Sequence, residues 1–267
     1  MRVAHDFPMR PQVVAHRGAS HDIAEHTLGA YVAALDAGAE ALECDVRLTA
    51  DGHLVCVHDR NLRRTAGARG LVSTMELKDL EELDFASWKH GYWTGEDEAP
   101  DRDEQLHRVL TLQTLLETVR DYDRRVEVAI ETKHPTRYGG LTERRLADML
   151  GRFGWTRKGA PVRVMSFSFT ALQRFERLAP DVQLVQLLER ARNWPLLHRT
   201  IGPDWAVGPG VGSLMRHPRL GPRILAAGHE LHVWVVNTEE ELKYCLDLGV
   251  SAVISDRPEY MLELLGH

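Results

Sequence analysis

The sequence LHVWVVNTEEELKYCLDLGVSAVIS, residues 231–255, contains a complete strand–helix–strand unit. Leu231–Val236 and Ala252–Ser255 are short runs rich in apolar and β-branched residues, which is typical of buried strands. Between them the spacing predicts a helix over Glu239–Leu248, stopped at Gly249. Strands joined by such a crossover lie parallel in one sheet.

The same alternation extends through the rest of the chain. Further main strands are expected at Val13–His16, Ala41–Leu48, Val126–Glu131, Val162–Phe167, Gln183–Leu188 and near Trp205–Val207, with an additional strand at Leu54–His58. Helices are expected at Thr27–Ala37, Thr111–Asp121, Thr142–Phe153, Ala171–Leu178, Pro195–Ile201, Arg219–Ala227 and Glu259–Leu265. Eight main strands, each followed by a helix, favour an α/β fold, a (β/α)8 TIM barrel, over an open sheet. No glycine-rich dinucleotide or P-loop fingerprint supports the open alternative.

One interval, Arg60–Arg108, does not fit the alternation and is interpreted as a small insertion after strand 2. A short helix is expected in it, signalled by a capping box at Ser73 and Glu76 like the one at Thr238 and Glu241. The insertion forms either a lid or wall of the site, or a surface subdomain that only stabilises the fold. Its helix has Leu77, Leu80 and Leu83 on one side; beyond it lie Trp88, Tyr92, Trp93 and the acidic stretch Glu96-Asp97-Glu98. Residues 1–267 are expected to form a single domain containing this insertion, residues 60–108.

Composition excludes several classes of protein. The formal net charge is −6 and no basic stripe dominates, which argues against a nucleic-acid partner. No apolar run approaches the roughly 18 residues that a transmembrane segment needs. The polar N-terminus, Met1–Gln12, does not resemble a cleaved signal peptide. Cys44, Cys56 and Cys245 lack metal-ligand spacing and are expected to be reduced core thiols of a cytoplasmic protein.

Two predicted strands carry charges where a parallel barrel should be apolar. In Ala41–Leu48 the apolar residues alternate with Glu43, Asp45 and Arg47, so the charged set is expected to face the barrel interior. In the next main strand Glu131 lies on the same face as Lys133, at the carboxyl end where barrel chemistry takes place.

Three carboxylates are therefore expected at one mouth: Glu43, Asp45 and Glu131. Hard oxygen ligands suit Ca²⁺ or Mg²⁺, with Mn²⁺ as a further possibility, better than Zn²⁺. The alternative is a structural ion-pair network with Arg47 and Lys133. Against it, three carboxylates and two cations leave negative charge that a divalent ion would neutralise.

His16 and His58 end strands that point at the same mouth. A histidine pair can act as general base and general acid near neutral pH. Gly18 permits a tight turn beside His16, and Arg17 and Lys133 are suited to hold phosphate oxygens. An acid–base pair, two cations and a metal site together indicate phosphodiester cleavage.

The sequence resembles the glycerophosphodiester phosphodiesterase family from its first strand to its last. The residues that carry the resemblance are His16-Arg17-Gly18-Ala19, Gly38-Ala39-Glu40, Leu42-Glu43-Cys44-Asp45-Val46, Leu48-Thr49-Ala50-Asp51-Gly52, His58-Asp59, Leu62-Arg63-Arg64-Thr65, Ile130-Glu131-Thr132-Lys133, Ser166-Phe167, Trp234-Val235-Val236-Asn237 and Ser255-Asp256-Arg257-Pro258. The resemblance implies a barrel with an insertion after strand 2. It also implies a divalent metal on Glu43, Asp45 and Glu131, catalysis by His16 and His58, phosphate contacts from Arg17 and Lys133, and Trp234 lining the substrate pocket. The alternative role for Trp234 is purely structural, as an aromatic residue of the barrel core.

The chain departs from the family pattern at three places. The usual Pro-Glu-Asn-Thr is Ala24-Glu25-His26-Thr27, which puts His26 near the expected site. The usual Ile-Pro-Thr-Leu is Val109-Leu110-Thr111-Leu112, and Val235 replaces Thr in Trp-Thr-Val-Asn. None of these departures removes a proposed catalytic group.

The expected reaction is metal-dependent hydrolysis of a small glycerophosphodiester to glycerol 3-phosphate and an alcohol. A lysophospholipase D acting on lysophospholipids at the same site is the alternative, for which Trp88, Tyr92 and Trp93 would form an acyl-chain groove. A catalytically silent phosphate-binding module would have lost a histidine or carboxylate, and none is lost. The sequence does not determine the alcohol, the native metal or the oligomeric state.

Overall fold

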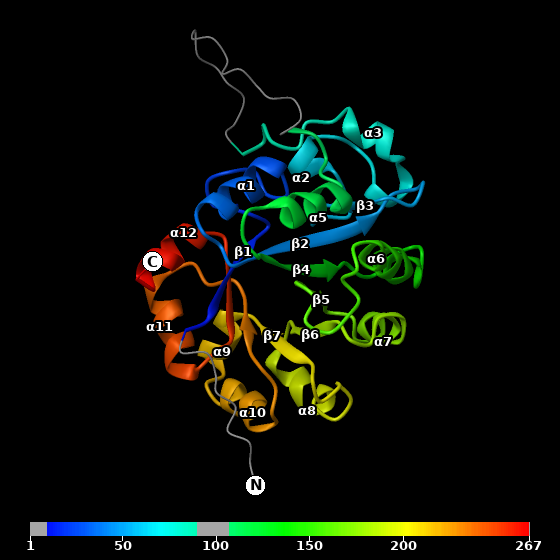
Figure 1. Ribbon diagram of the computed structural model, residues 1–267. Helices are drawn as coiled ribbons and strands as arrows, with labels where there is room; N and C mark the ends of the chain where they lie inside the picture. The colour runs from blue at the N-terminus through cyan, green and yellow to red at the C-terminus, as the bar shows by residue number, and fades with distance from the viewer. Residues whose placement is uncertain (1–9, 90–106, 267) are drawn as a thin grey trace.

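The centre of the molecule is a parallel barrel. The computed structural model describes residues 10–89 and 107–266. Eight parallel strands follow the order β7-β6-β5-β4-β2-β1-β9-β8, and β3 pairs antiparallel with β2. Isolated parallel bridges, Val207 with Leu231 and Gly210 with Trp234, join the two ends of this order and nearly close the barrel. The helices surround the strands (Figure 1), which confirms the predicted fold class.

The strands agree closely with the predicted segments. They are β1 (Gln12–His16), β2 (Ala41–Leu48), β3 (Leu54–Cys56), β4 (Glu127–Thr132), β5 (Val162–Ser166), β6 (Gln183–Leu188), β7 (Ala206–Pro209), β8 (His232–Val233) and β9 (Ala252–Ser255). The last two lie in the strand–helix–strand unit at residues 231–255, but β8 is much shorter than Leu231–Val236. The residues on either side of β8, Leu231 and Trp234, form isolated bridges, and Val236 forms a single hydrogen bond to Ile254, so no continuous ladder covers the whole segment.

Most helices were also predicted within a few residues. The described α-helices are α1 (Leu28–Asp36), α2 (Arg63–Ala66), α3 (Leu77–Glu81), α5 (Leu112–Asp121), α6 (Leu141–Arg152), α7 (Phe169–Leu178), α8 (Trp194–Leu197), α9 (Val211–Arg216), α10 (Leu220–Ala226), α11 (Glu239–Leu248) and α12 (Pro258–Leu264). Short 3₁₀ turns lie at Val72–Thr74 and Ala191–Asn193. Helices α2 and α9 were not predicted, because four and six residues give too short an apolar pattern. None of the described helices has the length and apolar character to cross a bilayer.

One of the two predicted capping boxes is correct. At α11 the Thr238 hydroxyl accepts from the Glu241 N–H, and the Glu241 carboxylate accepts from the Thr238 N–H. The box predicted at Ser73 and Glu76 is wrong, since Glu76 itself is the N-cap of α3 and its side chain makes no capping bond. Instead the Asp51 carboxylate, from the turn before β3, accepts from the first N–H of this helix.

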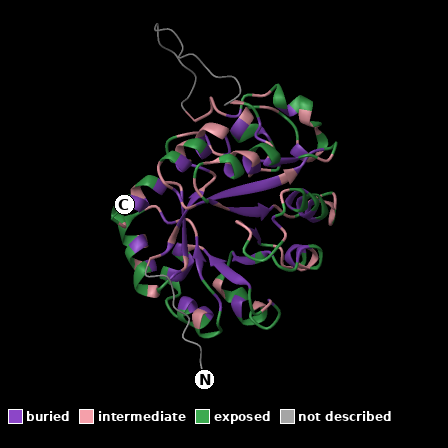
Figure 2. Cartoon of the chain, in the orientation of Figure 1, coloured by how far each residue is buried: buried purple, intermediate pink, exposed green. Residues whose placement is uncertain are grey.

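The alternation along β2 has the predicted orientation. Leu42, Cys44 and Val46 are fully buried in the large apolar layer between strands and helices. Glu43 and Asp45 are also buried, 2% and 1% exposed, and face the barrel interior. Figure 2 shows the result: the strands are almost entirely buried, while the helices expose one side.

Strand register brings the polar residues together. His16 on β1 pairs with Glu43 on β2, and Asp45 on β2 pairs with Glu131 on β4. Since β1, β2 and β4 are adjacent and parallel, their carboxyl ends meet at one edge. Strand β3 ends at Cys56, short of the predicted end at His58, although the Val57 N–H still donates to the Asp45 carbonyl.

The interval predicted as an insertion contains α2, a 3₁₀ turn and α3 in its described part. Leu80 is fully buried there, in a small apolar cluster of its own with Val55 and Leu62. Tyr92, Trp93 and the acidic stretch Glu96-Asp97-Glu98 lie outside the described residues. All three cysteines are buried and form no disulfide.

Candidate active site

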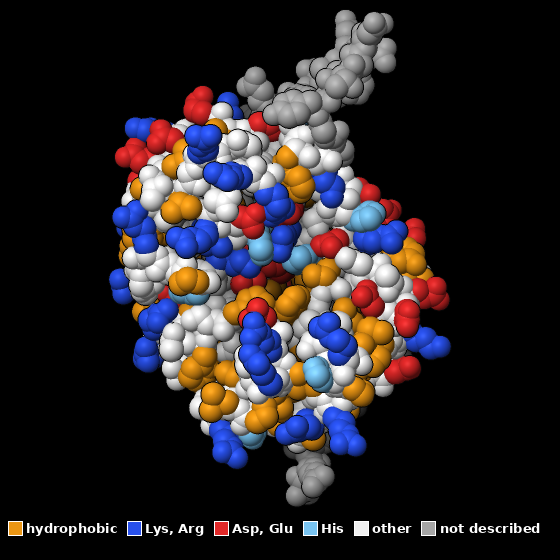
Figure 3. Space-filling model, turned by 180° about the vertical axis from the view of Figure 1, so that it is seen from behind, with side chains coloured by type: hydrophobic (Ala, Val, Ile, Leu, Met, Phe, Trp, Pro, Cys, Tyr) orange, Lys and Arg blue, Asp and Glu red, His pale blue; other side chains and the backbone are white. Residues whose placement is uncertain are grey.

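A cavity of about 150 Å³ lies at the carboxyl ends of the strands. Its walls combine charged and histidine side chains with an apolar group; the lining residues are His16, Arg17, Glu43, His58, Glu131, Lys133, Met165, Phe167, Leu187, Trp234, Val235 and Ile254. Figure 3 shows acidic and histidine side chains gathered around a hollow near the centre of one face. The structure therefore brings together all the sequence-predicted site residues, with Asp45 directly beneath through its contact with Lys133.

Three carboxylates meet at the floor of this cavity. Each of Glu43, Asp45 and Glu131 offers an oxygen within 4.8 Å of the other two, and all three are buried. Burial, with the nearby charge of Asp45, raises the pKa of Glu43 well above its usual value and that of Glu131 to about 8. Three such groups cannot all be ionised here without added positive charge.

Cationic side chains supply part of that charge. The Lys133 ammonium lies 2.8 Å from Glu131 and 3.0 Å from Asp45, and Arg17 Nε lies 3.1 Å from the other Asp45 oxygen. Arg47, expected in the alternative ion-pair network, instead donates twice to the His58 carbonyl, at 2.9 and 2.6 Å. An ion-pair network thus exists, but with Arg17 in place of Arg47.

The donor set fits a divalent cation. Asp45 Oδ1 is buried and makes no hydrogen bond of good geometry, although the Lys133 ammonium is near it. The raised pKa values of Glu43 and Glu131 show that the cluster favours an additional positive charge, as protons or as a metal ion. Closely spaced carboxylate oxygens are the ligands preferred by Mg²⁺, Ca²⁺ and Mn²⁺.

His26, which replaces the usual Asn, contacts this cluster directly. It has a left-handed backbone, φ 61°, a conformation that Asn tolerates better than most residues. Burial lowers the pKa of its imidazole, which is therefore neutral and donates its Nε2–H to Asp45 Oδ2 at 2.9 Å. Nδ1 lies 2.8 Å from the Tyr31 hydroxyl, whose one proton is shared between this nitrogen and the Glu43 carbonyl, 3.1 Å away. Although burial alone would raise the pKa of Asp45, this bond and the charges of Lys133 and Arg17 hold it well below its usual value.

His16 is oriented by a carboxylate from the last strand. Its Nδ1–H donates to Asp256 Oδ1 at 2.6 Å, and Asp256 follows β9 directly. The Ser20 hydroxyl and the Asn237 amide also donate to this carboxylate, at 3.0 and 2.7 Å. Against the effect of burial, these partners lower the pKa of Asp256. An ionised carboxylate only accepts, so Nδ1 carries the proton and Nε2 is available to the cavity.

His58 has the same arrangement. Its Nδ1–H donates to Asp59 Oδ1 at 2.8 Å, and Arg64 holds the other Asp59 oxygen at 2.7 Å. Burial lowers the pKa of His58 to about 4, so the ring is neutral at pH 7 and its Nε2 is an acceptor. Arg47 anchors the backbone of the same residue through the His58 carbonyl.

Arg17 is held by its backbone and by Glu25. Its φ of 60° turns the chain sharply after β1, and its N–H donates to the Glu43 carboxylate and carbonyl, both at 3.1 Å. Its Nη1 donates to Glu25 at 3.0 Å. Gly18 follows with φ 87°, and a Cβ there would lie 2.6 Å from the Ala30 carbonyl carbon, so the turn requires glycine.

The opposite wall of the cavity is apolar. Trp234 lies between the strands at half-burial, and its indole N–H donates to the Gly208 carbonyl at 2.7 Å. Phe167, 42% exposed, meets it edge to face at 5.5 Å between ring centroids. The two interpretations of Trp234 are therefore compatible: it contacts the inner barrel layer and it lines the cavity.

The sequence did not assign roles to four residues that orient the site: Asp256, Asp59, Glu25 and Arg47. Asp256 could have been found, since it is the first residue after the last strand, where barrel active sites are built. For Arg47 no sequence signal exists, because its partner is a backbone carbonyl.

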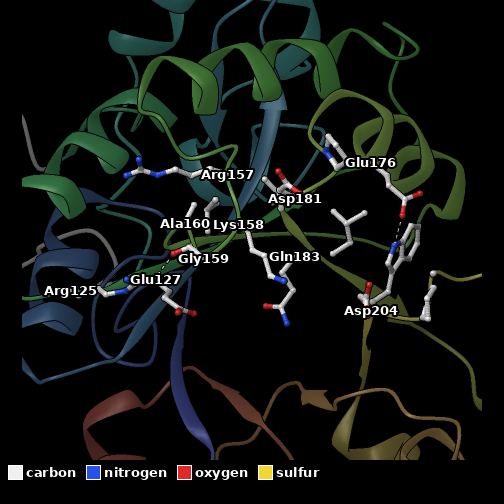
Figure 4. A pocket seen from close by; sticks show the side chains of 17 residues that line it. Arg125, Glu127, Arg157, Lys158, Gly159, Ala160, Glu176, Asp181, Gln183 and Asp204 are labelled. Carbon is white, nitrogen blue, oxygen red and sulfur yellow. Dashed lines mark hydrogen bonds between the residues drawn. The ribbon is translucent and has the colours of Figure 1, made fainter.

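A second, larger cavity of about 570 Å³ lies at the amino ends of β4 to β7 (Figure 4). Both acidic and basic side chains line it, and Glu176 accepts from the Trp205 indole at 2.9 Å. It lacks histidine and contains no cluster of carboxylates able to share an ion; among the described residues that cluster is found at the other end. This end of a barrel is associated with stability rather than catalysis.

Comparison with known proteins identifies the family of this chain. Residues 16–260 match the model of the glycerophosphoryl diester phosphodiesterase family. A probable glycerophosphodiester phosphodiesterase 1 of Mycobacterium tuberculosis is 43% identical over 252 residues, covering 93% of this chain and 90% of the relative. A glycerophosphodiester phosphodiesterase of Bacillus subtilis is 31% identical over 256 residues, covering 94% and 85%.

A solved structure is similar as well. An Oleispira antarctica phosphodiesterase in complex with the product sn-glycerol-3-phosphate superimposes with a TM-score of 0.80 and 25% identity, over 97% of this chain and 98% of that one. The family match over most of the chain and the two relatives above 30% identity decide the assignment. This chain belongs to the glycerophosphodiester phosphodiesterase family and is a phosphoric diester hydrolase.

Proposed function

We propose that this protein hydrolyses glycerophosphodiesters to glycerol 3-phosphate and an alcohol, with His16 and His58 as its acid–base pair and a divalent cation on Glu43, Asp45 and Glu131. One observation carries the proposal most directly. Two imidazoles, each fixed by an aspartate on Nδ1, border the cavity whose floor is the buried carboxylate cluster.

The cation, when bound, would neutralise phosphate charge and activate the attacking oxygen. Side chains of the protein bind the phosphate and transfer the protons. Arg17 and Lys133 line the cavity and would bind phosphate oxygens, Arg17 through its remaining N–H groups and Lys133 as a point charge.

Proton transfer falls to the two histidines. One ring is neutral, and its Nε2 takes the proton of the attacking hydroxyl or water; the other ring starts as the imidazolium and gives its Nε2 proton to the leaving alcohol. Asp256 and Asp59 hold the rings in the tautomer that this requires and stabilise the imidazolium when it forms. The attacking group is either water or a neighbouring glycerol hydroxyl.

The product assignment is supported by the Oleispira relative, which was solved with sn-glycerol-3-phosphate. The apolar wall of Phe167 and Trp234 would then lie beside one end of the diester. The segment 60–108 is proposed to be an insertion in a single barrel domain. Its described part contacts the site, since Arg64 bonds to both Asp59 and Glu25.

A lysophospholipase D activity is the second candidate. The observation that favours it is the apolar half of the cavity, with Phe167 42% exposed and available to an acyl chain. Trp88 is described, but it is packed under the Arg64 and Lys89 cations rather than in the cavity lining.

The proposal is tested by incubating the purified protein with glycerophosphocholine and lysophosphatidylcholine after chelation, with Ca²⁺, Mg²⁺ or Mn²⁺ then added back. We expect metal-restored release of glycerol 3-phosphate from glycerophosphocholine. Faster release of choline from the lysolipid would favour the second candidate. No turnover of either substrate with any of the three metals would contradict both.

A further inference from the structure

A small pocket beside the active site is lined by four cations and has no assigned role. It measures about 40 Å³, and Arg47, Arg60, Lys133 and Arg137 line it. Its other lining residues are Leu48, Val72, Ser73, Pro135, Thr136 and Thr142, so none of its described lining residues is a carboxylate. Lys133 is already paired with Asp45 and Glu131, but the three arginines have no carboxylate partner among the described residues and repel one another unless an anion is present.

The cations keep donors free for a ligand. Arg47 uses Nε and Nη2 on the His58 carbonyl, which leaves Nη1. The Arg60 side chain forms no hydrogen bond or ion pair with any part of the chain that the structure describes. Within residues 10–89 and 107–266, Arg137 contacts only the Ser73 carbonyl, at 3.5 Å, and the Tyr138 ring.

Two further features favour an anion. Thr142 is 1% exposed, and its hydroxyl is buried without a hydrogen-bond partner. It lies in the first turn of α6, a 12-residue helix whose N-cap, Gly140, provides no side-chain cap. The amino end of a helix carries partial positive charge and free N–H groups, which bind phosphate groups readily. The one carboxylate of this turn, Glu143, is bound by Arg174 and His134.

The size restricts the ligand. A water molecule needs about 10–15 Å³ of cavity volume. The 40 Å³ pocket therefore holds roughly three waters or one tetrahedral oxyanion, and it is too small for a sugar or an acyl chain. The pocket also adjoins the site of reaction: Lys133 lines both cavities, and Arg47 holds the backbone of His58.

We infer that this pocket is a second oxyanion subsite, which binds a phosphate group other than the scissile one. The group would come either from a substrate whose leaving alcohol carries a further phosphate, or from free inorganic phosphate. The inference rests on the proposed function for its place beside the reaction, but phosphate binding itself can be measured without turnover.

The test uses the double variant Arg60→Gln/Arg137→Gln, because both residues are exposed and neither lines the catalytic cavity. The matched control is Arg152→Gln/Arg177→Gln, two exposed arginines elsewhere with the same change in charge. The substrates are two glycerophosphodiesters that differ only in a terminal phosphomonoester on the leaving glycerol. In parallel, binding of inorganic phosphate is measured by calorimetry.

If the phosphate group belongs to the substrate, the ratio of kcat/KM for the phosphorylated diester to that for the plain diester should fall about tenfold or more in the double variant. The control should keep the wild-type ratio. The plain diester should be cleaved at an unchanged rate. If the pocket instead binds free inorganic phosphate, calorimetry should show one phosphate-binding site fewer in the double variant than in the control. The preference between the two substrates should then be unchanged. If neither quantity differs between the double variant and the control, the inference is wrong. Failure of the wild-type protein to cleave either diester would contradict the proposed function alone, since calorimetry still reports on the pocket.

Discussion

His16 and Asp256 lie at opposite ends of the chain and form one hydrogen-bonded pair, with 2.6 Å between Nδ1 and Oδ1. Strands β1 and β9 are hydrogen-bonded neighbours, so closure of the barrel places the residue after the last strand beside the last residue of the first. The carboxylate fixes which ring nitrogen carries the proton, and therefore which nitrogen faces the cavity.

Replacement of Asp256 by Asn tests this pair. An amide can donate to Nδ1 and favour the wrong tautomer, so we expect kcat to fall roughly a hundredfold or more with little change in KM. Ser20→Ala removes one hydrogen bond to the same carboxylate and should have a much smaller effect. Steady-state kinetics on glycerophosphocholine provide the comparison; an unchanged kcat in Asp256→Asn would show that the tautomer is not set by this contact.

His16→Ala and His58→Ala should each reduce turnover of glycerophosphocholine by about 10²–10⁴-fold, the usual contribution of a positioned acid or base. Both side chains border a cavity and are partly exposed, so the fold should remain intact, as judged by circular dichroism and thermal unfolding. The exposed His217→Ala is a suitable control. Near-wild-type rates in both site variants would refute the assignment.

Metal affinity should depend on pH through Glu131. Its pKa of about 8 means that the carboxyl group is mostly protonated at pH 7 and must lose that proton to bind a cation. We therefore expect affinity to rise as pH increases through about 8, and the raised pKa of Glu43 adds to the same trend. Calorimetry in buffers of different ionisation enthalpy should detect proton release on binding, which Glu131→Gln abolishes or weakens together with affinity. The exposed Glu263→Gln should behave as wild type.

Glu25 should contribute stability that is lost in acid. Hydrogen bonds and charges from Arg64 and Arg17 outweigh burial and lower its pKa from 4.5 to about 2. Because the folded pKa is the lower one, the stabilisation is fully present above pH 4.5 and disappears as pH falls towards 2. Urea unfolding should show Glu25→Gln less stable by at most roughly 3 kcal/mol at pH 7, a difference that shrinks between pH 4.5 and 2. A difference independent of pH would mean that the ion pairs are not its cause.

Much of the fold could be predicted because the strands alternate in a simple way. The charged residues of β2 have one orientation compatible with an apolar layer outside the strands, and this predicts that Glu43 and Asp45 face inward. A prediction from neighbouring residues is wrong where a residue distant in the sequence takes over the same hydrogen bond. Asp51 caps α3 from the preceding turn, so the capping box expected at Ser73 does not form.

The site was predictable to the extent that each strand end could be located. His16 and Glu131 follow from strand positions alone, whereas the partners that orient the histidines depend on how the barrel closes. Arg47 illustrates the limit: its charge suggested a carboxylate partner, yet it binds the His58 carbonyl, which has no sequence signature. At position 26, where the family usually has Asn, His26 forms a hydrogen bond to Asp45 through Nε2.

The central claim is that Glu43, Asp45 and Glu131 hold one divalent cation beneath the two histidines. Anomalous diffraction from a crystal soaked with Mn²⁺ tests it most directly. The account predicts a single strong peak within about 2.0–2.6 Å of an oxygen from each of the three carboxylates. A peak elsewhere, or none at saturating Mn²⁺ while Lys133 stays bound to Asp45 and Glu131, would contradict it.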